Sequence, residues 1–168
     1  MRGNPKGIVI RLATRKDLDV LMNQRHRMFE DIRHRTPAEL KRADSIYRKW
    51  VIKMSRKKRF VGFLAVKENG ESVGGGCVWI RETQPSPSSG PRLQMPYLLS
   101  MYTKPRYRGR GIATSIVKEA MKWSKKKGFK MMTLHASEFG KPVYTKIGWK
   151  RTWEMRVDLS KFSPKDFV

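Results

Sequence analysis

The segment Leu98–Ala113, with the sequence LLSMYTKPRYRGRGIA, constrains the fold more than any other part of the chain. Its first half predicts a strand at 97–103, which Pro105 ends, and a loop of arginine and glycine then leads into a helix that begins at Ile112. Such a loop between a strand and a helix directs several backbone N–H groups to one place, with the positive end of the helix dipole behind them. The segment therefore predicts an anion-binding turn in an α/β fold.

The loop itself combines glycine with positive charge. Its glycines allow the main chain to approach a ligand closely, and its cations suit a pyrophosphate: Lys104, Arg106, Arg108 and Arg110. The loop lacks the Gly-Lys-Ser/Thr ending of a Walker loop and the G-x-G-x-x-G spacing of a dinucleotide-binding turn. We therefore expect a phosphate-bearing ligand that is held in a turn of another kind.

The whole chain, residues 1–168, reads as one domain of the α/β (α+β) class in the order β-αα-ββ-β-α-β-α-β. Hydrophobic spacing and the signals that start and stop helices define its elements. The expected strands are 8–12, 60–67, 72–81, 97–103, 130–136 and 149–159, and the expected helices are 15–34, 37 into the basic run 55–59, 112–127 and 141–146.

Local signals support several of these boundaries. The run Thr36–Glu39 combines an N-cap, a proline at the first helical position and an acid three residues after the cap. Asn69-Gly70 predicts a hairpin turn, and the three glycines Gly74–Gly76 predict a bulge or a close backbone approach inside its second strand. We expect the Pro/Ser-rich loop 84–91 and the tail 160–168 to be flexible.

The charge of the chain suggests an anionic partner. The chain has 38 Lys and Arg against 14 Asp and Glu, a net charge of +24, which attracts nucleic acid, an acidic lipid surface or a phosphate-rich small molecule. The runs Arg56–Arg59 and Lys125–Lys127 favour nucleic acid or a ribonucleoprotein. A solvated basic surface explains the same charge without any partner.

Cysteine content and hydropathy argue against other classes. The single cysteine, Cys77, excludes an internal disulfide framework, and no Cys/His cluster has zinc-ligand spacing, so we expect no metal. No apolar run approaches the roughly 20 residues of a membrane span. The apolar stretch Ile8–Ile10 is far shorter than the core of a signal peptide. We therefore expect a soluble, cytoplasmic protein without a membrane partner.

Two landmarks in the second half of the chain resemble one known family. The loop reads as Arg106-x-x-Gly109-x-Gly111 or as Arg108-x-x-Gly111-x-Ala113, and Pro105 favours the second register. Further along, Ser137–Trp149 reads SEFGKPVYTKIGW. These segments resemble the Gln/Arg-x-x-Gly-x-Gly/Ala loop and the Asn-x-x-Ala-x-x-x-Tyr-x-x-x-Gly-Phe motif of the GCN5-related N-acetyltransferase (GNAT) superfamily. Serine, glycine and tryptophan here replace the usual Asn, Ala and Phe.

The resemblance implies a single GNAT-type domain, with a mixed, mostly antiparallel central sheet flanked by helices, that transfers an acetyl group from acetyl-CoA to an amine. In the matching register, the backbone N–H of Met101 is the oxyanion donor, and Tyr144 is the general acid that protonates the departing thiolate. The residues implied to bind acetyl-CoA are Met101, Tyr102, Thr103, Arg108, Gly109, Arg110, Gly111, Ile112, Ala113, Thr114, Ser137 and Tyr144.

Some roles have a competing interpretation. Tyr144 also fits a core tyrosine, and Ser137 also fits a cap on the helix that follows it. The general base is open between Glu82, His135 and a chain of water molecules. Where some relatives place a glutamate on the fourth strand, this chain offers Tyr97, Ser100 and Tyr102.

The acceptor also stays open. A small amine, an amino acid or a protein N-terminus fits, while the net charge of +24 disfavours polyamines and basic protein tails. The oligomeric state is open between a monomer and a homodimer. The alternative function is a basic nucleic-acid-binding or ribonucleoprotein-binding module on an acetyltransferase-like scaffold.

Overall fold

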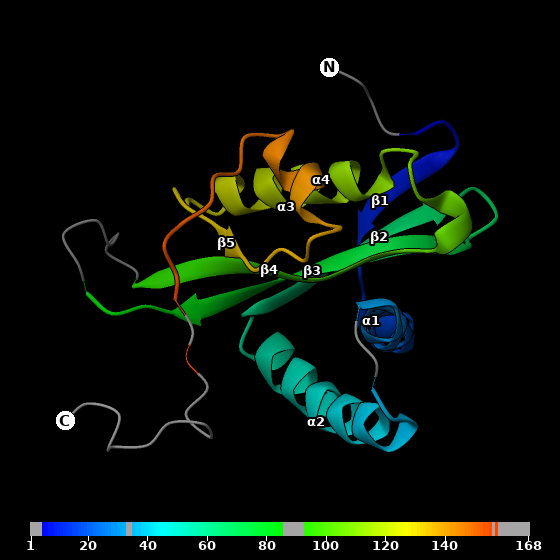
Figure 1. The fold of residues 1–168 in the computed structure, drawn as a ribbon, viewed down its shortest axis with the longest axis horizontal. Coiled ribbons are helices and arrows are strands. Elements are labelled where there is room, and N and C mark those ends of the chain that lie inside the picture. Colours follow the sequence, from blue (N-terminus) through cyan, green and yellow to red (C-terminus); the bar gives the residue numbers. More distant parts are fainter. Residues whose placement is uncertain (1–4, 33–34, 86–92, 156, 158–168) are drawn as a thin grey trace.

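The computed structural model of the chain describes residues 5–32, 35–85, 93–155 and 157. Figure 1 shows the arrangement of its strands and helices. In chain order the elements are β1 Ile8–Leu12, α1 Leu18–Ile32, α2 Pro37–Arg56, β2 Phe60–Lys67, β3 Ser72–Glu82, β4 Gln94–Thr103, α3 Ile112–Lys126, β5 Thr133–Leu134 and α4 Lys141–Thr145, with short 3₁₀ turns at Arg15–Asp17 and Pro105–Tyr107.

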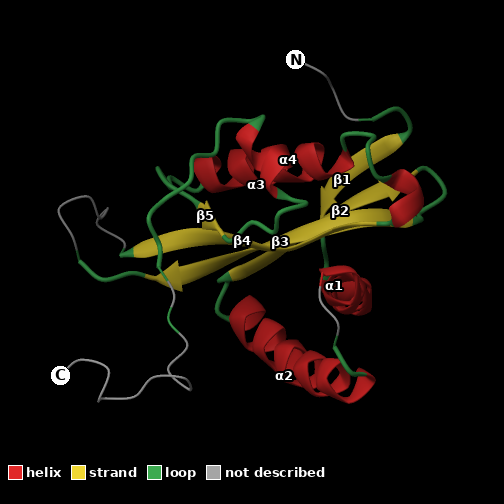
Figure 2. Cartoon of the chain, in the orientation of Figure 1, coloured by secondary structure: helices red, strands yellow, loops and turns green. Residues whose placement is uncertain are grey.

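The molecule is a sheet covered by helices on both faces. The strands lie in the order β1-β2-β3-β4-β5, and every neighbouring pair is antiparallel except β4 and β5, which run parallel. Figure 2 shows α1 and α2 on one face of the sheet and α3 and α4 on the other. The mixed, mostly antiparallel sheet and its flanking helices confirm the predicted fold class.

Alternation along the strands supplies a core on each face, because neighbouring residues of a strand point to opposite sides. On the α3 side, the side chains that are at most 2% exposed include Val73, Val78, Leu98, Ile116 and Val117. On the α1 and α2 side, the buried side chains are Leu21, Met22, Tyr47, Val51, Leu64 and Cys77. Both helix layers are therefore held by apolar packing against the same sheet.

The helix start signals form as the sequence predicts. At α2, the Glu39 backbone N–H donates to Thr36 Oγ1 at 3.2 Å, and the Thr36 N–H donates to Glu39 Oε2 at 2.8 Å. The turn before α1 repeats the pattern, because the Thr14 N–H donates to Asp17 Oδ2 at 2.7 Å. These reciprocal bonds satisfy N–H groups that a helix leaves without partners.

The end of the chain departs from expectation. The predicted final strand 149–159 is wrong over 149–155, which contain no strand, and the predicted strand 130–136 shortens to the two residues of β5. The reason is geometric: β5 pairs with β4 at only two positions, so it offers no length of edge on which a further strand could form. Trp153, from the expected strand, is 99% exposed.

Other expectations fall on segments that are not described. Most of the loop 84–91 and all of the tail 160–168 lie outside the described residues. Within the described ranges, no helix is both long enough and apolar enough to span a bilayer. No cluster of three or more His, Cys, Asp or Glu side chains suited to a metal ion occurs in the same part of the chain.

Candidate active site

Strand β4 carries a bulge near its C-terminal end. The register between β3 and β4 shifts between Gly75 and Cys77, with the extra residue on β4 rather than on the glycine-bearing β3, and Ser100 has a φ of +54°. This φ is uncommon for a residue with a Cβ, and the bulge re-aims the residues that follow it. The Ser100 hydroxyl is held by the Tyr47 hydroxyl of α2 at 3.1 Å.

The bulge is accommodated by glycine on the neighbouring strand. A Cβ placed on Gly76 would lie 2.2 Å from Met101 Sδ and 3.2 Å from Ile116 Cγ2. The Met101 side chain therefore packs in the space that a larger residue at position 76 would fill, as part of the core beneath α3. Any chemical role of Met101 thus falls to its main chain.

Beyond the bulge, β4 has one open edge. It pairs with β5 only through Tyr97 and Leu98, so residues 99–103 have no strand on that side among the described residues. The predicted residues Met101, Tyr102 and Thr103 lie on this open stretch. Unpaired backbone groups at a sheet edge can bind an extended polar chain as an added strand.

The turn after β4 has the geometry of an anion cradle. Gly109 and Gly111 have φ of +76° and +81°, and a Cβ on either would meet nothing within 4 Å. Gly111 is the N-cap of α3, and no side chain caps this helix start. Since the first helical bond runs from the Ser115 N–H to the Gly111 carbonyl, the preceding N–H groups of Ile112–Thr114 remain available for a ligand.

Only some of the cationic side chains in this turn are positioned to contact an incoming ligand. The Arg108 guanidinium pairs with Asp31 of α1 and donates to the Thr103 carbonyl at 3.0 Å. Arg110 is exposed, with its guanidinium carbon 5.4 Å from the centre of the Tyr107 ring. Arg108 therefore fixes the turn to β4 and α1, and Arg110 is the better placed of the two for an incoming anion.

The base of the turn is fastened by Glu71. Lys104 Nζ donates to its Oε1 at 2.8 Å and the Tyr107 hydroxyl donates to its Oε2 at 3.2 Å. The Lys104 hydrogen bond lowers the pKa of the Glu71 carboxyl to about 2. Glu71 therefore stays ionised, and it draws Lys104 away from any ligand.

Helix α4 places Tyr144 beside the same region. The residue is 9% exposed, and its ring lies 5.9 Å from that of Trp149. Burial raises the pKa of the Tyr144 phenol to about 12, with a further contribution from Tyr97. Tyr144 therefore keeps its proton at neutral pH, as a proton donor must, although its burial also fits a core tyrosine.

The turn before α4 is fixed by Ser137, whose Oγ accepts from the Gly140 N–H at 3.2 Å. Its carbonyl accepts from the Lys141 N–H at 2.9 Å. A Cβ on Gly140 would lie 3.1 Å from Tyr144 Cε2, so glycine here lets the tyrosine ring pack against the turn. In this structure the Ser137 hydroxyl therefore acts as a turn cap.

The two predicted bases have different surroundings. Arg59 donates to Glu82 at 2.5 Å and lowers the pKa of that carboxyl, so Glu82 is a weak proton acceptor. His135 follows β5 directly, and its two ring nitrogens face Tyr97 and Glu154. Glu82 and His135 thus lie on opposite sides of β4, and the His135 side chain bonds to Tyr97 of that strand.

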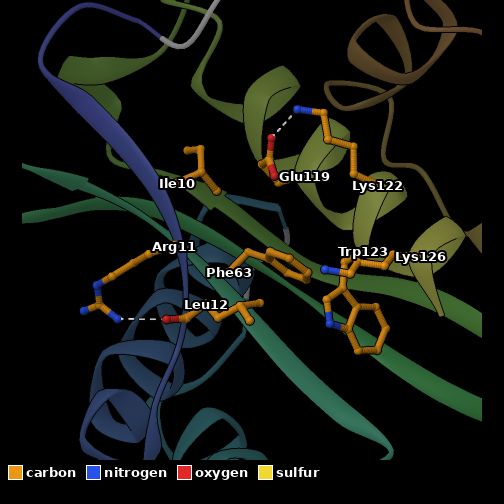
Figure 3. Close-up of a pocket in the computed structure, with 8 residues that line it drawn as sticks. All are labelled: Ile10, Arg11, Leu12, Phe63, Glu119, Lys122, Trp123 and Lys126. Atoms are coloured by element: carbon orange, nitrogen blue, oxygen red, sulfur yellow. Dashed lines mark hydrogen bonds and ion pairs between the residues drawn. The ribbon is translucent and has the colours of Figure 1, made fainter.

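A separate hollow of about 250 Å³ lies between β1, β2 and α3 (Figure 3). Phe63 and Trp123 line it. Among its ionic groups, Lys122 pairs with Glu119 at 2.6 Å and Arg11 pairs with Asp17 at 2.7 Å. It borders the β1 side of the sheet, while the open stretch of β4 faces the β5 side.

Sequence reasoning missed two contributors to this geometry. Nothing in the sequence links Asp31 to Arg108, because their pairing depends on how α1 packs in three dimensions. Ser100 had a weaker signal: it is a polar residue in an apolar strand, and its partner strand carries three glycines.

The α/β sheet with its open fourth strand and uncapped helix start has counterparts among known proteins. The profile of the acetyltransferase (GNAT) family matches residues 21–149. The chain belongs to this family. Among curated proteins, none matches the chain.

Solved structures agree in fold. A GCN5-related N-acetyltransferase from Ralstonia eutropha JMP134 is 27% identical with a TM-score of 0.82, over 92% of this chain and 99% of that one. A predicted acetyltransferase from Clostridium acetobutylicum, solved with acetyl-CoA, is 24% identical with a TM-score of 0.82, over 92% and 98% of the chains. An aminoglycoside 6'-N-acetyltransferase from Acinetobacter baumannii is 15% identical with a TM-score of 0.68, over 90% and 97%.

Proposed function

We propose that this protein is an acetyl-CoA-dependent N-acetyltransferase that acetylates a primary amine. The observation that carries the proposal is the uncapped start of α3, with its open glycine turn, directly after the unpaired stretch of β4. Together these features offer N–H groups for a pyrophosphate and an extended edge for the amide-bearing arm of the same ligand. The acetyl-CoA complex of the Clostridium acetobutylicum relative supports this choice of ligand.

Each residue of the proposed site has a role that follows from its chemistry. The pyrophosphate binds at Arg108–Ala113, with Thr114 beside it, and the pantetheine arm runs along Met101–Thr103. The Met101 N–H polarises the thioester carbonyl and stabilises the charge that develops on its oxygen. Tyr144, which burial keeps protonated, gives its proton to the departing thiolate. Holding the amine and the thioester together supplies a large share of the acceleration.

The nucleic-acid alternative gains no support from the fold. The two basic runs, 56–59 and 125–127, lie at the ends of α2 and α3, which cover opposite faces of the sheet (Figure 1). A nucleic-acid-binding surface typically gathers such charges on one face of a domain. RNA binding that weakens steeply with salt would revive this alternative.

Calorimetric titration with acetyl-CoA and desulfo-CoA, with ATP as the control nucleotide, tests the proposal. Both CoA compounds should bind the wild type and ATP should not. Gly111→Val should abolish binding, because a β-branched residue does not tolerate a φ of +81°. Gly70→Val is the matched control, since Gly70 has a φ of +83° in the distant β2–β3 hairpin. Normal binding by the Gly111 variant would exclude the predicted register.

Turnover measurements then test whether Tyr144 is the general acid. Tyr144→Phe should leave acetyl-CoA affinity nearly unchanged and lower turnover by about 10²-fold, the usual contribution of a general acid. Turnover equal to that of the wild type would show that Tyr144 is only a core residue.

A further inference from the structure

Three side chains beside the open stretch of β4 form a continuous hydrogen-bonded chain. The Tyr97 hydroxyl bonds to His135 Nδ1, and His135 Nε2 lies 2.6 Å from Glu154 Oε1. The three residues come from β4, from the residue after β5 and from the segment after α4. A phenol, an imidazole and a carboxylate in this order can pass a proton through the imidazole, because each of its nitrogens has a partner.

Tyr97, the first member of this hydrogen-bonded chain, lies on the face of the sheet that α1 and α2 cover. Tyr97 pairs across the strands with Trp79, and their rings meet edge to face at 6.4 Å. Trp79 in turn contacts Trp50 of α2 at 5.2 Å. Arg81 completes the surroundings, with its guanidinium 5.0 Å from the Tyr97 ring centre and a 3.2 Å hydrogen bond to Thr133. Aromatic walls therefore fix the Tyr97 ring beside a half-exposed imidazole.

Tyr97 also lies between the two halves of the candidate site. It is one of the two residues at which β4 still pairs with β5, and the unpaired stretch that contains Met101 follows on the same strand. Its phenol also contributes to the raised pKa of Tyr144. Outside the hydrogen-bonded chain, Arg81 is the charged group whose contact with the Tyr97 ring the structure describes.

We propose that Tyr97, His135 and Glu154 form the proton relay that deprotonates the acceptor amine. The proposal rests on the proposed acetyltransferase function and deepens it. Tyr97 is the catalytic residue, because its hydroxyl meets the acceptor nitrogen. His135 receives the proton through Tyr97, and Glu154 is a positioning residue that orients the imidazole and balances the charge it acquires.

The proton balance closes with these groups. The acceptor ammonium loses one proton through Tyr97 to His135, which passes it to water. The nitrogen lone pair then forms the C–N bond with the acetyl carbonyl carbon. As the C–S bond breaks, its electron pair leaves on sulfur. The thiolate takes the Tyr144 proton, the adduct nitrogen loses its extra proton through Tyr97 and His135 to water, and Tyr144 regains a proton from water. Amide, free thiol and one released proton are the products.

The test compares pH profiles, with a primary amine that the wild type acetylates and with free CoA thiol as the readout. Tyr97→Phe and His135→Gln should lower kcat/KM by about 10²-fold at pH 7, the usual contribution of a general base. An alkyl ammonium with a pKa near 10.4 loses its proton to solvent as the pH rises toward that value. The kcat/KM of both variants should therefore approach that of the wild type near pH 10. Glu154→Gln should show the same pattern with a smaller loss.

His26→Gln is the matched control, because His26 Nδ1 also lies 2.6 Å from a carboxylate, Asp44, but away from Tyr97. Its profile should keep the wild-type shape. Thermal melting of each variant establishes that it is folded. Relay variants that are equally impaired at every pH, or as active as the wild type at pH 7, would overturn the relay and leave acetyl transfer intact. A wild type that binds acetyl-CoA but acetylates no amine would overturn the proposed function and the relay with it.

Discussion

At one edge of the sheet, β1 pairs with β2 along all five of its residues, from Ile8 to Leu12. At the other edge, β5 pairs with β4 at two positions and then the strands part. The β1 edge continues into a turn that the Arg11–Asp17 ion pair closes at 2.7 Å. Beyond that pairing, residues 99–103 of β4 have no strand on the β5 side within the described part of the chain. The proposed site lies at the second edge, where binding groups stay available because the sheet does not use them.

The largest expected effect concerns the last residue of β4 that pairs on both sides. Leu98 is 2% exposed, and Leu98→Ala should lower the free energy of unfolding by about 3 kcal/mol, from lost burial and the cavity left behind. Leu99, the first residue beyond the pairing with β5, is only half-buried, and its change to alanine should cost about half as much. Equal losses in denaturant titrations would mean that the open stretch is packed as tightly as the paired one.

The next prediction concerns the closed edge. Arg11, and then the Thr14 N–H, lower the pKa of Asp17 well below its usual range. A lowered folded-state pKa stabilises the protein above about pH 4, and this contribution fades as the pH falls through the folded-state value. Asp17→Asn should therefore cost about 2 kcal/mol at pH 7 and much less near pH 2.

Melting temperatures of this variant and the wild type across that range test the prediction. Glu39→Gln is the control, because it removes the charge of the equivalent acid at the exposed start of α2, while glutamine can still form the capping box. A difference between Asp17→Asn and the wild type that does not change with pH would exclude the ion pair as its source.

The smallest expected effect tests the bulge. Ser100→Val should cost about 1–2 kcal/mol, because a β-branched residue is unfavourable at a φ of +54°. Ser100→Gly relieves the strain but loses the Tyr47 hydrogen bond, so its stability should stay within about 0.5 kcal/mol of the wild type. If chemical denaturation gave the opposite order, Ser100 would not have this backbone conformation in solution.

The features that the sequence predicts correctly depend on neighbouring residues. Thr36 and Glu39 lie one helical turn apart, so their capping box follows from local spacing. Asn69-Gly70 marks the hairpin, although only Gly70 has a positive φ and the turn is longer than two residues, with the Lys67 N–H bonded to the Glu71 carbonyl.

The features that the sequence does not reveal depend on register and long-range packing. Residues 149–155 form no strand because β5 is too short to pair with them, and the length of β5 cannot be read from the sequence of 149–155. The Arg108–Asp31 ion pair joins the turn before α3 to α1. The link from Tyr97 to Glu154 forms only when three distant segments fold together. Motif and resemblance thus predict the turn proposed to bind acetyl-CoA, and three-dimensional packing assembles the proposed proton relay.

The order of the strands also has a consequence for folding. Each strand lies beside the strand that precedes it in the chain, and the parallel step from β4 to β5 is bridged by α3. During synthesis, which proceeds from the N-terminus, every new strand therefore meets an exposed partner that has already been made. The short connections from β2 to β3 and from β3 to β4 make these pairings local, which favours rapid folding of the central strands. The edge that meets no further strand is the last one added, and the same edge forms the proposed site.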